Sequence, residues 1–588
     1  MPHQPSNKRA KGNRIRATMT RTAILLVFAG TVLMMDTLSA QLPGDRPAPN
    51  PRATRSVVMA RQGMIATSQP LASAAGLQVL QEGGNAVDAA VTAAAVLSVV
   101  EPTMTGIGGD LFATVFDPRA GKPAGLNASG RSGYAATPAE FGRRGLTAVP
   151  ERGVLSITVP GVVDGWAELL AKHGTIPLAR ALRPAIEYAR NGFPVSEIIA
   201  YQWRGVEEVL AADRAAAATF LVGGHAPAPG QVFANPHLAS TLEQIASGGR
   251  DAFYKGAIAQ AIVADLRARG GLLDARDFAE HHADWVDPIG TSYRGVDLFE
   301  LPPNTQGFVA LEMLNILEGY DLKTLGHNTA AYLHLLVEAK RIAFADRDAW
   351  LADPASVPAD VLRRLISKDY AASRRKEIDP NRAAASYAPM AGGGRMPAGA
   401  GIDIEATGDT VYLTAADGKG NVVSLIQSLF DAFGSGIVAG DTGVALQNRG
   451  SLFVLKPGHP DEIAPHKRPM HTLVPAMAMK DGRPWLSYGV MGGDMQPQGH
   501  VQVLLNLVEF GMNVQEAGEA PRFRHSVAGL AIESGISPEA RFGLGQRGHR
   551  LVDTIGAFGG FQGILIDPRS GVLMGGSDPR KDGLAIGF

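Results

Sequence analysis

The chain has 588 residues, of which 45% are hydrophobic and 19% are charged, and this composition is typical of a globular protein with a large core. Its formal net charge of −1 gives no indication of binding to nucleic acid or to an anionic membrane surface. The sequence contains no cysteine, which excludes disulfide bonds, thiolate catalysis and cysteine-ligated metals.

The first forty residues have the pattern of a secretory signal peptide. Six basic residues and no acidic residue precede an apolar run at residues 23–35, and small residues that suit cleavage after Ala40 follow it. The apolar run is short for a membrane span. An uncleaved anchor is the alternative, because the basic segment before the run is long. We therefore expect a signal peptide over residues 1–40, a tether over residues 41–56, and a periplasmic or secreted protein.

The next part of the chain predicts helices, and the C-terminal part predicts strands. Residues 86–100 are nearly all apolar and follow Asn85, a good capping residue, so they indicate a fully buried helix. A long helix is expected over residues 329–353 and a flexible linker over residues 385–409. After the linker, the pattern predicts strands at 411–416, 422–430, 472–480 and 484–490 and a helix at 501–510. Helices around two mainly antiparallel sheets fit this order better than a parallel sheet.

Most familiar catalytic and binding motifs are missing from the sequence. It contains no G-x-S-x-G, H-E-x-x-H or P-loop, and its glycine-rich stretches at 106–110 and 491–494 lack the spacing of a dinucleotide site. The stretch "EHHAD" at residues 280–284 indicates a surface helix more than a metal site, because adjacent histidines on a helix point in different directions. We predict no cofactor and no metal.

Thr410 stands at the point where the polar linker changes into a β-rich segment. A threonine hydroxyl is a poor nucleophile unless a base lies beside it. An N-terminal threonine carries its own base, because an α-amine has a pKa of about 7.7–8.0. Cleavage of the Asp409–Thr410 bond would create such a residue. The alternative is that Thr410 simply begins a core strand, since threonine suits strands.

Longer stretches of the chain resemble the gamma-glutamyltransferase (gamma-glutamyl transpeptidase) family of N-terminal-nucleophile hydrolases. They include "GGNAVDAAVTAAAVLSVVEPTMTGIGGD", "YRGVDLFELPPNTQG", "FGSGIVAGDTGVALQNRG", "KRPMHTLVPAM", "GGDMQPQGHVQVLLNLVEFGMNVQEAGEAPRF" and "GGSDPRKDGLAIG". The resemblance runs in order from residue 57 to residue 588. It implies an α+β fold, an αββα four-layer sandwich formed by two subunits cut from one precursor. The large subunit would span residues 57–409 and the small subunit residues 410–588.

The resemblance also implies a catalytic set around Thr410. The hydroxyl of Thr410 would cleave the bond after Asp409 and would then attack the substrate amide. The N–H groups of Gly492 and Gly493 match the oxyanion hole of the family, and Ser428 matches a hydroxyl near the nucleophile. The expected partners are a small-molecule amide and the two subunits of one precursor, without nucleic acid. A homodimer of heterodimers is an assembly that the resemblance allows.

The substrate pocket departs from the family pattern. Ser129 stands where typical members have an arginine for the glutamyl carboxylate, and Ser451 and Leu452 replace the acids that bind the glutamyl amine. Each lost charge-assisted hydrogen bond costs about 1.5–3 kcal/mol, or roughly 10- to 150-fold in affinity. The candidates for substrate binding in another geometry are Arg131, Asn448, Arg449, His471, Thr472 and Asp494. Alternatively, Arg449 pairs with Asp494, and His471 packs under a sheet.

The expected function is hydrolysis, with transfer as an option, of a gamma-glutamyl or related amide through a threonine acyl-enzyme, as in glutathione hydrolases. A second possibility is an amidohydrolase or acylase for a small carboxylated amide of the oxamate, glutaryl or cephalosporin type. The stretches "SLIQS", "QNRG" and "GGDMQPQGH" favour it, because they resemble the gamma-glutamyltransferase-like branch that includes oxamate amidohydrolases and acylases. The third possibility is a binding protein that is neither cleaved nor catalytic.

Overall fold

The fold is described for Met1 and for residues 53–394, 408–554, 556 and 558–588 of a computed structural model, with the backbone alone at Gly408 and Asp409. The predicted signal peptide after Met1, most of the predicted tether and residues 395–407 of the predicted linker lie outside this description. Residues 385–394 of that linker run along a helix: Trp350 donates a hydrogen bond to the carbonyl of Met390, and Gly394 donates one to the carbonyl of Ala349. Gly408 and Asp409, its last two residues, begin a strand.

Two seven-stranded antiparallel sheets are found in the described residues. One has the strand order β1-β17-β16-β13-β12-β9-β8, and the other has the order β18-β2-β10-β11-β3-β4-β7. The first contains β1 (Val58–Ala60), β8 (Ile289–Tyr293), β9 (Val296–Glu300), β12 (Ala476–Lys480), β13 (Arg483–Met491), β16 (Gly560–Ile566) and β17 (Leu573–Ser577). The second contains β2 (Gly63–Thr67), β3 (Asp110–Phe116), β4 (Pro123–Ala128), β7 (Asp284–Val286), β10 (Gly408–Asp417), β11 (Val422–Asp431) and β18 (Leu584–Gly587). Both sheets combine strands from before and after residue 409, so neither predicted subunit forms a complete sheet.

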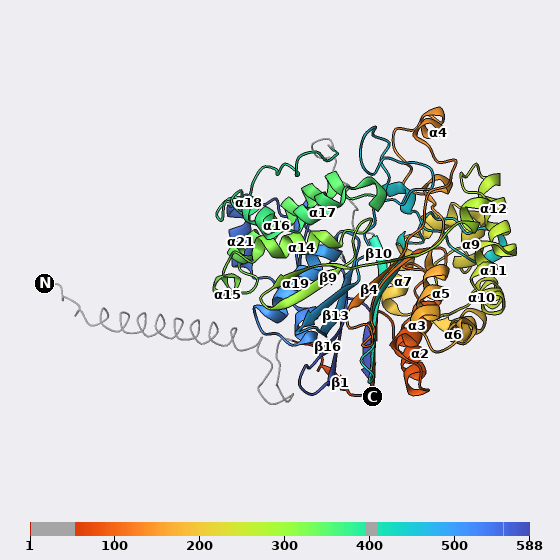
Figure 1. Ribbon diagram of the computed structural model, residues 1–588, viewed down its shortest axis with the longest axis horizontal. Helices are drawn as coiled ribbons and strands as arrows, with labels where there is room; N and C mark the ends of the chain where they lie inside the picture. Colours follow the sequence, from red (N-terminus) through yellow and green to blue (C-terminus); the bar gives the residue numbers. More distant parts are fainter. Residues whose placement is uncertain (2–52, 395–407, 555, 557) are drawn as a thin grey trace. The chain divides into compact units, whose positions relative to one another are not determined.

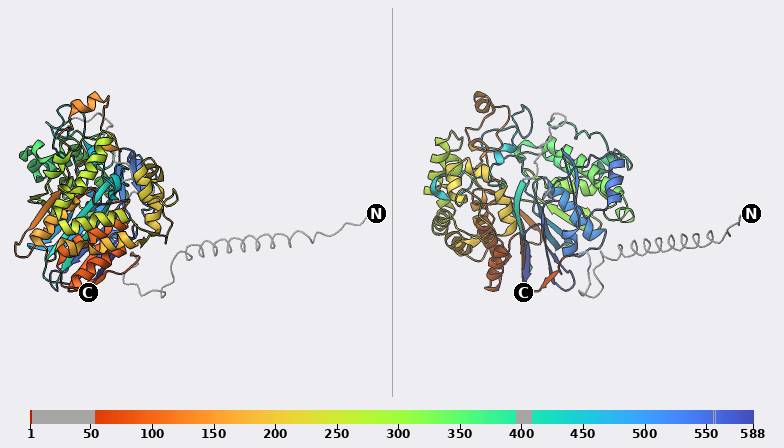
Figure 2. Two further views of the ribbon diagram at one scale, coloured as in Figure 1. Left: turned by 90° about the vertical axis from the view of Figure 1, so that its right-hand side faces the viewer. Right: turned by 180° about the vertical axis from the view of Figure 1, so that it is seen from behind.

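Helices cover the outer face of each sheet. The second sheet packs against α2 (Pro70–Gln81), α3 (Ala86–Val100) and α5 (Val162–His173), and α6 (Leu178–Asn191) packs on α3. The first packs against α14 (Gly307–Leu317), α19 (Met495–Val508) and α20 (Val514–Glu519), with α16 (Ala330–Trp350) on α14 and α21 (Pro538–Gln546) on α16. Figure 1 shows the strands between these two groups of helices, and the rear view in Figure 2 shows the same layers. The predicted αββα sandwich is confirmed.

Shorter elements complete the described fold. The remaining helices are α4 (Pro138–Arg143), α7 (Glu197–Arg204), α8 (Glu207–Ala211), α9 (Arg214–Phe220), α10 (Pro236–Gly248), α11 (Arg250–Tyr254), α12 (Ala257–Ala268), α13 (Ala275–Ala279), α15 (Leu322–Leu325), α17 (Ala359–Leu365) and α18 (Lys368–Arg375). Two small hairpins pair β5 (Phe193–Pro194) with β6 (Val232–Phe233) and β14 (Phe523–Ser526) with β15 (Gly529–Ile532).

The buried helix predicted at residues 86–100 is confirmed as α3. The side chain of Asn85 accepts hydrogen bonds from the N–H groups of Val87 and Asp88, and the Asp88 carboxylate accepts one from the N–H of Asn85. This reciprocal capping box satisfies donors that would otherwise be unpaired at the helix start. All fifteen residues of α3 are buried, because the helix lies between the second sheet and its outer helices.

Strand β10 is buried on both faces, and the division of its side chains between these faces orients Thr410. Val411, Leu413 and Ala415 belong to the cluster that packs against the helices, whereas Tyr412 and Ala416 belong to clusters between the two sheets. Side chains alternate between the faces of a strand, so the even-numbered positions of β10 face the other sheet. The start of this strand therefore points into the centre of the sandwich.

Three sequence expectations differ from the structure. Strand β12 begins at Ala476 instead of residue 472, because the Thr472 carbonyl accepts a side-chain hydrogen bond and takes no part in strand pairing. Helix α19 begins at Met495, six residues earlier than predicted, directly after a turn of two glycines. The "EHHAD" stretch is wrong as a surface helix: α13 ends at Ala279, and His281 is buried against Tyr254, with ring centroids 5.1 Å apart.

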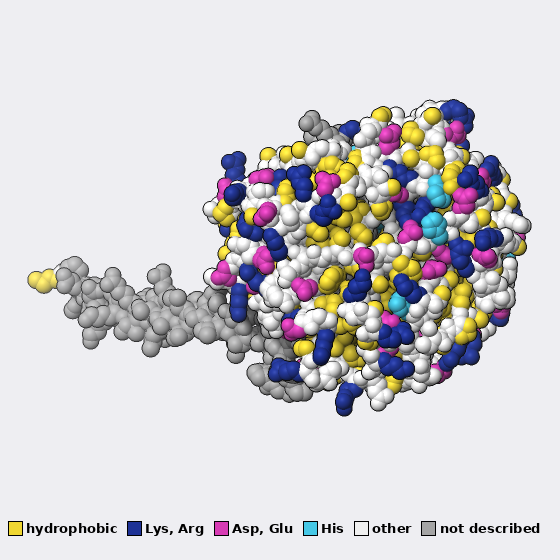
Figure 3. Space-filling model, viewed as in Figure 1, with side chains coloured by type: hydrophobic (Ala, Val, Ile, Leu, Met, Phe, Trp, Pro, Cys, Tyr) yellow, Lys and Arg dark blue, Asp and Glu magenta, His cyan; other side chains and the backbone are white. Residues whose placement is uncertain are grey.

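The face of the molecule seen in Figure 3 carries Lys, Arg, Asp and Glu side chains interspersed with one another. This mixture agrees with the formal net charge of −1. Within the described ranges, no helix combines the length and the apolar character that a membrane crossing requires.

Candidate active site

Thr410 lies at a β-bulge in a central strand. Asp409 pairs with Phe430 and Val411 pairs with Gln427, so two residues of β11, Ser428 and Leu429, stand opposite Thr410. The extra residue of this bulge is therefore in β11, and the ladder is interrupted opposite Thr410. The Thr410 side chain is buried, with 2% exposure. The bond after Asp409 therefore lies at an irregular point inside an otherwise regular strand pair.

The inner face of β10 runs antiparallel to that of β13 in the other sheet. The hydroxyls of Thr414 and Ser487 are 2.7 Å apart, and the ring of Tyr412 fills the space that a side chain at Gly489 would occupy. The two contacts follow one antiparallel register. A shift of two residues toward the N-terminus of β10 corresponds to a shift of two residues toward the C-terminus of β13. Extended by one more step, this register would bring Thr410 opposite Met491, where β13 ends.

Gly492 and Gly493 follow β13 directly and begin the turn into α19. Their φ angles are +113° and +57°, values that glycine adopts without the steric cost of a side chain. The carbonyl of Gly492 accepts a hydrogen bond of 2.9 Å from the N–H of Met495 at the helix start. The N-terminal end of a helix carries a partial positive charge and favours anions. This turn thus offers backbone N–H groups and a favourable helix dipole at the end of β13.

A buried arginine links the strand opposite Thr410 to a neighbouring loop. Nη2 of Arg449 donates a 3.0 Å hydrogen bond to Oγ of Ser428, and Nη1 donates a 2.8 Å bond to Oγ1 of Thr472. The guanidinium also lies over the ring of Phe430, 4.5 Å from its centroid. Phe430 has a φ of +86°, which is unusual for a bulky residue and is held by a hydrogen bond from its N–H to Ser428 Oγ. Strained residues of this kind cluster at functional sites.

The same network continues to the turn after β13. The side-chain amide of Gln306 donates to the carbonyls of Thr472 and Gly493, at 3.0 and 3.2 Å. Arg347 donates both to Gln306 and to Asp494, at 3.1 and 2.5 Å. Asp494 therefore pairs with Arg347, and the alternative in which it pairs with Arg449 is wrong. Gln306 and Arg347 were missed as site residues, although Gln306 lies in the quoted motif "LPPNTQG".

His471 forms a fully buried pair with Asp110, which was also missed as a site residue. Nε2 of His471 is 3.2 Å from Oδ2 of Asp110, and Oδ1 of Asp110 accepts a 2.9 Å bond from the N–H of Gly130. Burial raises the pKa of Asp110 to about 7 against the opposing charge of Arg449. Burial also lowers the pKa of His471 well below its usual range. The sequence signal for Asp110 was the glycine-rich stretch that precedes it, since Asp110 begins strand β3 directly after these glycines.

Asn448 secures the end of β11. Its Nδ2 donates 2.6 Å and 2.8 Å hydrogen bonds to Oδ2 of Asp431 and to the carbonyl of Glu151, and its Oδ1 accepts a bond from the N–H of Asp431. Asp431 pairs in the sheet with Gly408, one residue before Asp409. Asn448 therefore fixes the strand that faces the predicted cleavage point.

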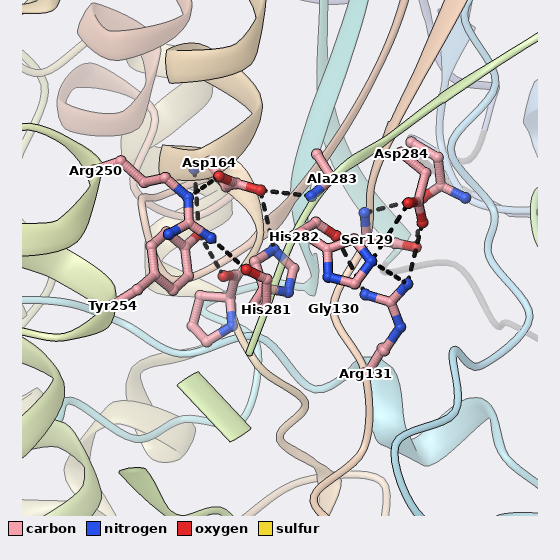
Figure 4. A network of polar contacts seen from close by, with 12 residues as sticks. Ser129, Gly130, Arg131, Asp164, Arg250, Tyr254, His281, His282, Ala283 and Asp284 are labelled. Carbon is pink, nitrogen blue, oxygen red and sulfur yellow. Dashed lines mark hydrogen bonds and ion pairs between the residues drawn. The ribbon is translucent and has the colours of Figure 1, made fainter. Parts of the chain in front are cut away.

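Arg131 lies in a separate polar network, shown in Figure 4, and points toward His282 and Asp284. It donates to Oδ2 of Asp284 at 3.1 Å and to the carbonyl of His282 at 3.2 Å. Arg468 also binds both residues and donates to the carbonyl of Ser129 at 3.0 Å. Asp284 is thus shared by two guanidinium groups, and burial together with Arg468 lowers the pKa of Arg131. The N–H of Gly130, the residue before Arg131, links this segment to Asp110.

Comparisons with known proteins identify relatives over nearly the whole chain. The family model of gamma-glutamyltranspeptidase matches residues 72–588. The chain is 42% identical to the glutathione hydrolase-like YwrD proenzyme of Bacillus subtilis, over 91% of this chain and 100% of that protein. It is 37% identical to the oxamate amidohydrolase proenzyme of Klebsiella pneumoniae, over 90% of this chain and 98% of that protein. The crystal structure of cephalosporin acylase from Bacillus halodurans superimposes with a TM-score of 0.84, 40% identity and coverage of 93% and 99%.

Proposed function

The chain belongs to the gamma-glutamyltranspeptidase family, and we propose that it is a self-cleaving enzyme that hydrolyses a gamma-glutamyl or related amide through an acyl-enzyme on Thr410. The observation that carries this proposal is the location of Thr410. It stands opposite a bulge in β11, and the register between β10 and β13, extended from Thr414 and Tyr412, supports a position near the glycine turn at the start of α19. The three relatives named above are enzymes, and two of them are named as proenzymes.

Self-cleavage begins when Oγ of Thr410 attacks the carbonyl carbon of Asp409. The C–N bond between Asp409 and Thr410 breaks, an ester forms on Oγ, and the proton of the hydroxyl goes to the departing α-amine. Water then hydrolyses the ester, which leaves a carboxylate on Asp409 and a free hydroxyl on Thr410. The products are a large subunit that ends at Asp409 and a small subunit of residues 410–588. Both stay together because the two sheets contain strands from each.

Turnover repeats the same chemistry on the substrate. The new α-amine of Thr410, with a pKa of about 7.7–8.0 in model peptides, removes the hydroxyl proton and later delivers it to the leaving amine. Oγ attacks the amide carbonyl, and the N–H groups of Gly492 and Gly493 stabilise the charge that develops on its oxygen. Water releases the acyl group as a carboxylate, or an acceptor amine takes it in a transfer reaction.

Arg449 supports the second candidate, an acyl group that carries a carboxylate but no ammonium group. Its buried guanidinium contacts Ser428, which stands opposite Thr410 in the sheet. A gamma-glutamyl group carries both a carboxylate and an ammonium, and a buried cation in this position repels the ammonium. A carboxylate would instead gain a charge-assisted hydrogen bond of about 1.5–3 kcal/mol. An oxamate-like or glutaryl-like amide therefore suits the pocket better than a gamma-glutamyl amide.

A substrate panel tests both candidates on the cleaved enzyme. Gamma-glutamyl, oxamate and glutaryl amides are compared by kcat/KM, with the Thr410→Ala variant as the blank. Turnover of the carboxylated amides at least 10-fold above that of the gamma-glutamyl amide supports the second candidate, since one such contact is worth about 10- to 150-fold. Preference for the gamma-glutamyl amide supports the first. A purified chain that stays uncleaved and turns over no amide would support the binding-protein alternative.

The substrate-binding roles of Arg131, Asn448, His471, Thr472 and Asp494 remain part of this proposal. Arg449 and Thr472 belong to one network and Arg131 belongs to another. The carboxylate of the substrate therefore has two candidate cationic partners, Arg449 and Arg131. We also propose that residues 1–40 direct the protein to the periplasm or the exterior and are then removed. N-terminal sequencing of protein from the periplasmic fraction tests this, with Gln41 as the expected first residue.

A further inference from the structure

Two histidines and a glutamate gather away from Thr410, at the start of α16. Among the described residues, His334, Glu338 and His549 each offer one ligand atom, and these atoms all lie within 4.8 Å of one another. His334 and Glu338 are four residues apart on α16 and therefore share one face of the helix. His549 reaches them from the segment that follows α21. All three side chains are buried.

The hydrogen bonds of His334 leave its Nδ1 available as a ligand. Nε2 lies 2.8 Å from the carbonyl oxygen of Asp379, which can only accept, so Nε2 carries the proton. In the neutral ring, Nδ1 then has a lone pair, and it points at Nε2 of His549 at 2.8 Å. Histidines that bind metals commonly donate their second N–H to a backbone carbonyl in this way. Without a metal, the two histidines hydrogen-bond to each other.

Glu338 is held in a similar manner and keeps one position free. Its carboxylate accepts hydrogen bonds from the Arg341 guanidinium at 2.8 Å, the N–H of Ala384 at 2.9 Å and the hydroxyl of Tyr387 at 2.7 Å. An ionised carboxylate has about four acceptor sites, so one remains after these three bonds. Such outer contacts orient a carboxylate ligand and are typical of metal sites.

A surface cavity gives access to this cluster. The cavity has a volume of about 1010 Å³, and its lining includes His549, His525 and Asp379. His549 therefore separates the cavity from the more deeply buried His334 and Glu338. A metal bound by all three residues could complete its coordination with a water molecule that enters from the cavity. Sites with three protein ligands and one open position are common for Zn²⁺.

We propose that His334, Glu338 and His549 form a binding site for a divalent transition metal, with Zn²⁺ as the best-matched ion. Two imidazole nitrogens and one carboxylate oxygen are the donors that zinc prefers in the absence of cysteine. Tetrahedral zinc holds neighbouring ligand atoms about 3.4 Å apart. The distance of 2.8 Å between Nδ1 of His334 and Nε2 of His549 would increase slightly when the ion binds. Any two ligand atoms that are nearly 4.8 Å apart would move closer together.

The site would also join the two subunits, an addition that depends on the proposed cleavage after Asp409. His334 and Glu338 belong to the large subunit, whereas His549 belongs to the small one. The outer contacts from Asp379, Ala384 and Tyr387 come from the large-subunit segment that follows α18, and the carbonyl of Arg547 in the small subunit binds the N–H of Ala383 in this segment. The metal would therefore stabilise the heterodimer by linking both chains, since binding to the folded form adds to its stability.

The experiment measures zinc binding to the full-length protein after chelator treatment and removal of any histidine tag. Equilibrium dialysis with metal analysis is expected to give one Zn²⁺ per chain for the wild type. His549→Ala should weaken binding at least about 100-fold, since loss of an outer contact alone costs 10- to 100-fold. His525→Ala is the matched control, because His525 lines the same cavity but lies outside the ligand set, and it should bind as the wild type does. Tyr387→Phe should have an intermediate effect, and circular dichroism verifies that each variant is folded.

Zinc should also raise the thermal midpoint of the wild type and of His525→Ala, but not that of His549→Ala. The absence of saturable zinc binding by the wild type, or equal binding by His549→Ala and His525→Ala, would overturn the proposal. The uncleaved Thr410→Ala precursor contains all three ligands and should bind zinc equally well. Its binding therefore tests the metal site independently of the enzymatic function. Chelator-induced dissociation of the subunits, seen only in the cleaved wild type, tests the link between them.

Discussion

Arg449 donates a 3.0 Å hydrogen bond to Ser428, and this contact brings a fully buried guanidinium to the strand that faces Thr410. Burial lowers the pKa of Arg449 to about 9, while Asp110 and Asp431 act in the opposite direction. The group thus remains charged at neutral pH. Because a fixed cation lies in this position, we expect the candidate site to prefer an anionic acyl group.

Replacement of Arg449 should change which acyl groups the enzyme accepts. In Arg449→Met, kcat/KM for a carboxylated amide should fall about 10- to 150-fold, because one charge-assisted hydrogen bond is lost. Arg449→Lys should lose less, since it keeps the charge but not the paired donors. Steady-state kinetics on the substrate panel give the comparison, and a denaturing gel verifies that each variant is cleaved. Equal losses for charged and neutral acyl groups would contradict the specific role.

Gly492 should affect the chemical step more than substrate binding. A side chain at its φ of +113° would turn the backbone and would lie 3.2 Å from Cα of Gly559. In Gly492→Ala, kcat should fall about 10²- to 10³-fold with little change in KM, as for other losses of an oxyanion donor. Gly482→Ala is the control, because Gly482 also has a positive φ, of +72°, but lies in open space at the β12–β13 turn. An unchanged kcat in Gly492→Ala would exclude the oxyanion role.

Asn448 should affect maturation. Asn448→Ala removes two hydrogen bonds to Asp431 and leaves this buried carboxylate short of partners, at a cost of about 1–3 kcal/mol. The strand opposite Gly408 then loses its anchor, and cleavage of the precursor should slow. A time course on denaturing gels measures this, with Ser451→Ala as the control because the Ser451 hydroxyl donates to the Asn448 carbonyl and its loss leaves the hydrogen bonds between Asn448 and Asp431 in place. Cleavage of Asn448→Ala at the wild-type rate would show that the anchor is dispensable.

Lys340 should make stability depend on pH in the alkaline range. Burial lowers its pKa from 10.5 to about 7, with Asp494 acting in the opposite direction. Between pH 7 and 10.5 the unfolded chain keeps this proton and the folded chain releases it, so the free energy of unfolding rises with pH in this window. The stabilising contribution is complete above pH 10.5 and is lost as the pH falls to about 7. One proton gives a slope of at most about 1.4 kcal/mol per pH unit.

Lys340→Met should remove this slope. Urea unfolding between pH 7 and 10 measures it, in the Thr410→Ala background so that unfolding involves a single chain. Lys480→Met provides a comparison with a less buried lysine, whose pKa is also lowered by burial. Parallel pH profiles for the parent and for Lys340→Met would mean that Lys340 is charged in the folded state.

Local patterns in the sequence predicted much of the fold. The apolar run after Asn85 predicted α3 with its correct bounds, and β-branched alternation predicted the central strands, because burial periodicity is a local property. The start of β12 was wrong because the carbonyl of Thr472 binds Gln306, a residue 166 positions away in the sequence. No local pattern reports such a contact.

The candidate site was less predictable than the fold. Thr410 was identified because the chain changes character there, and the glycine pair was identified from the family resemblance. The partners of the charged residues were not predictable from the sequence: Asp494 binds Arg347, and His471 binds Asp110, across separations of 147 and 361 residues. These pairings depend on how the sheets stack, and single-sequence patterns contain no information about that stacking.

The N-terminus of the small subunit tests the central claim most directly. Intact mass and N-terminal sequencing of the purified protein should show a chain that begins at Thr410 and ends at Phe588, together with a large chain that ends at Asp409. Thr410→Ala should remain one uncleaved chain without amide hydrolysis, because it lacks the hydroxyl that attacks in both reactions. A wild-type protein that hydrolyses amides as an uncleaved chain, or that is cleaved at another bond, would contradict the account.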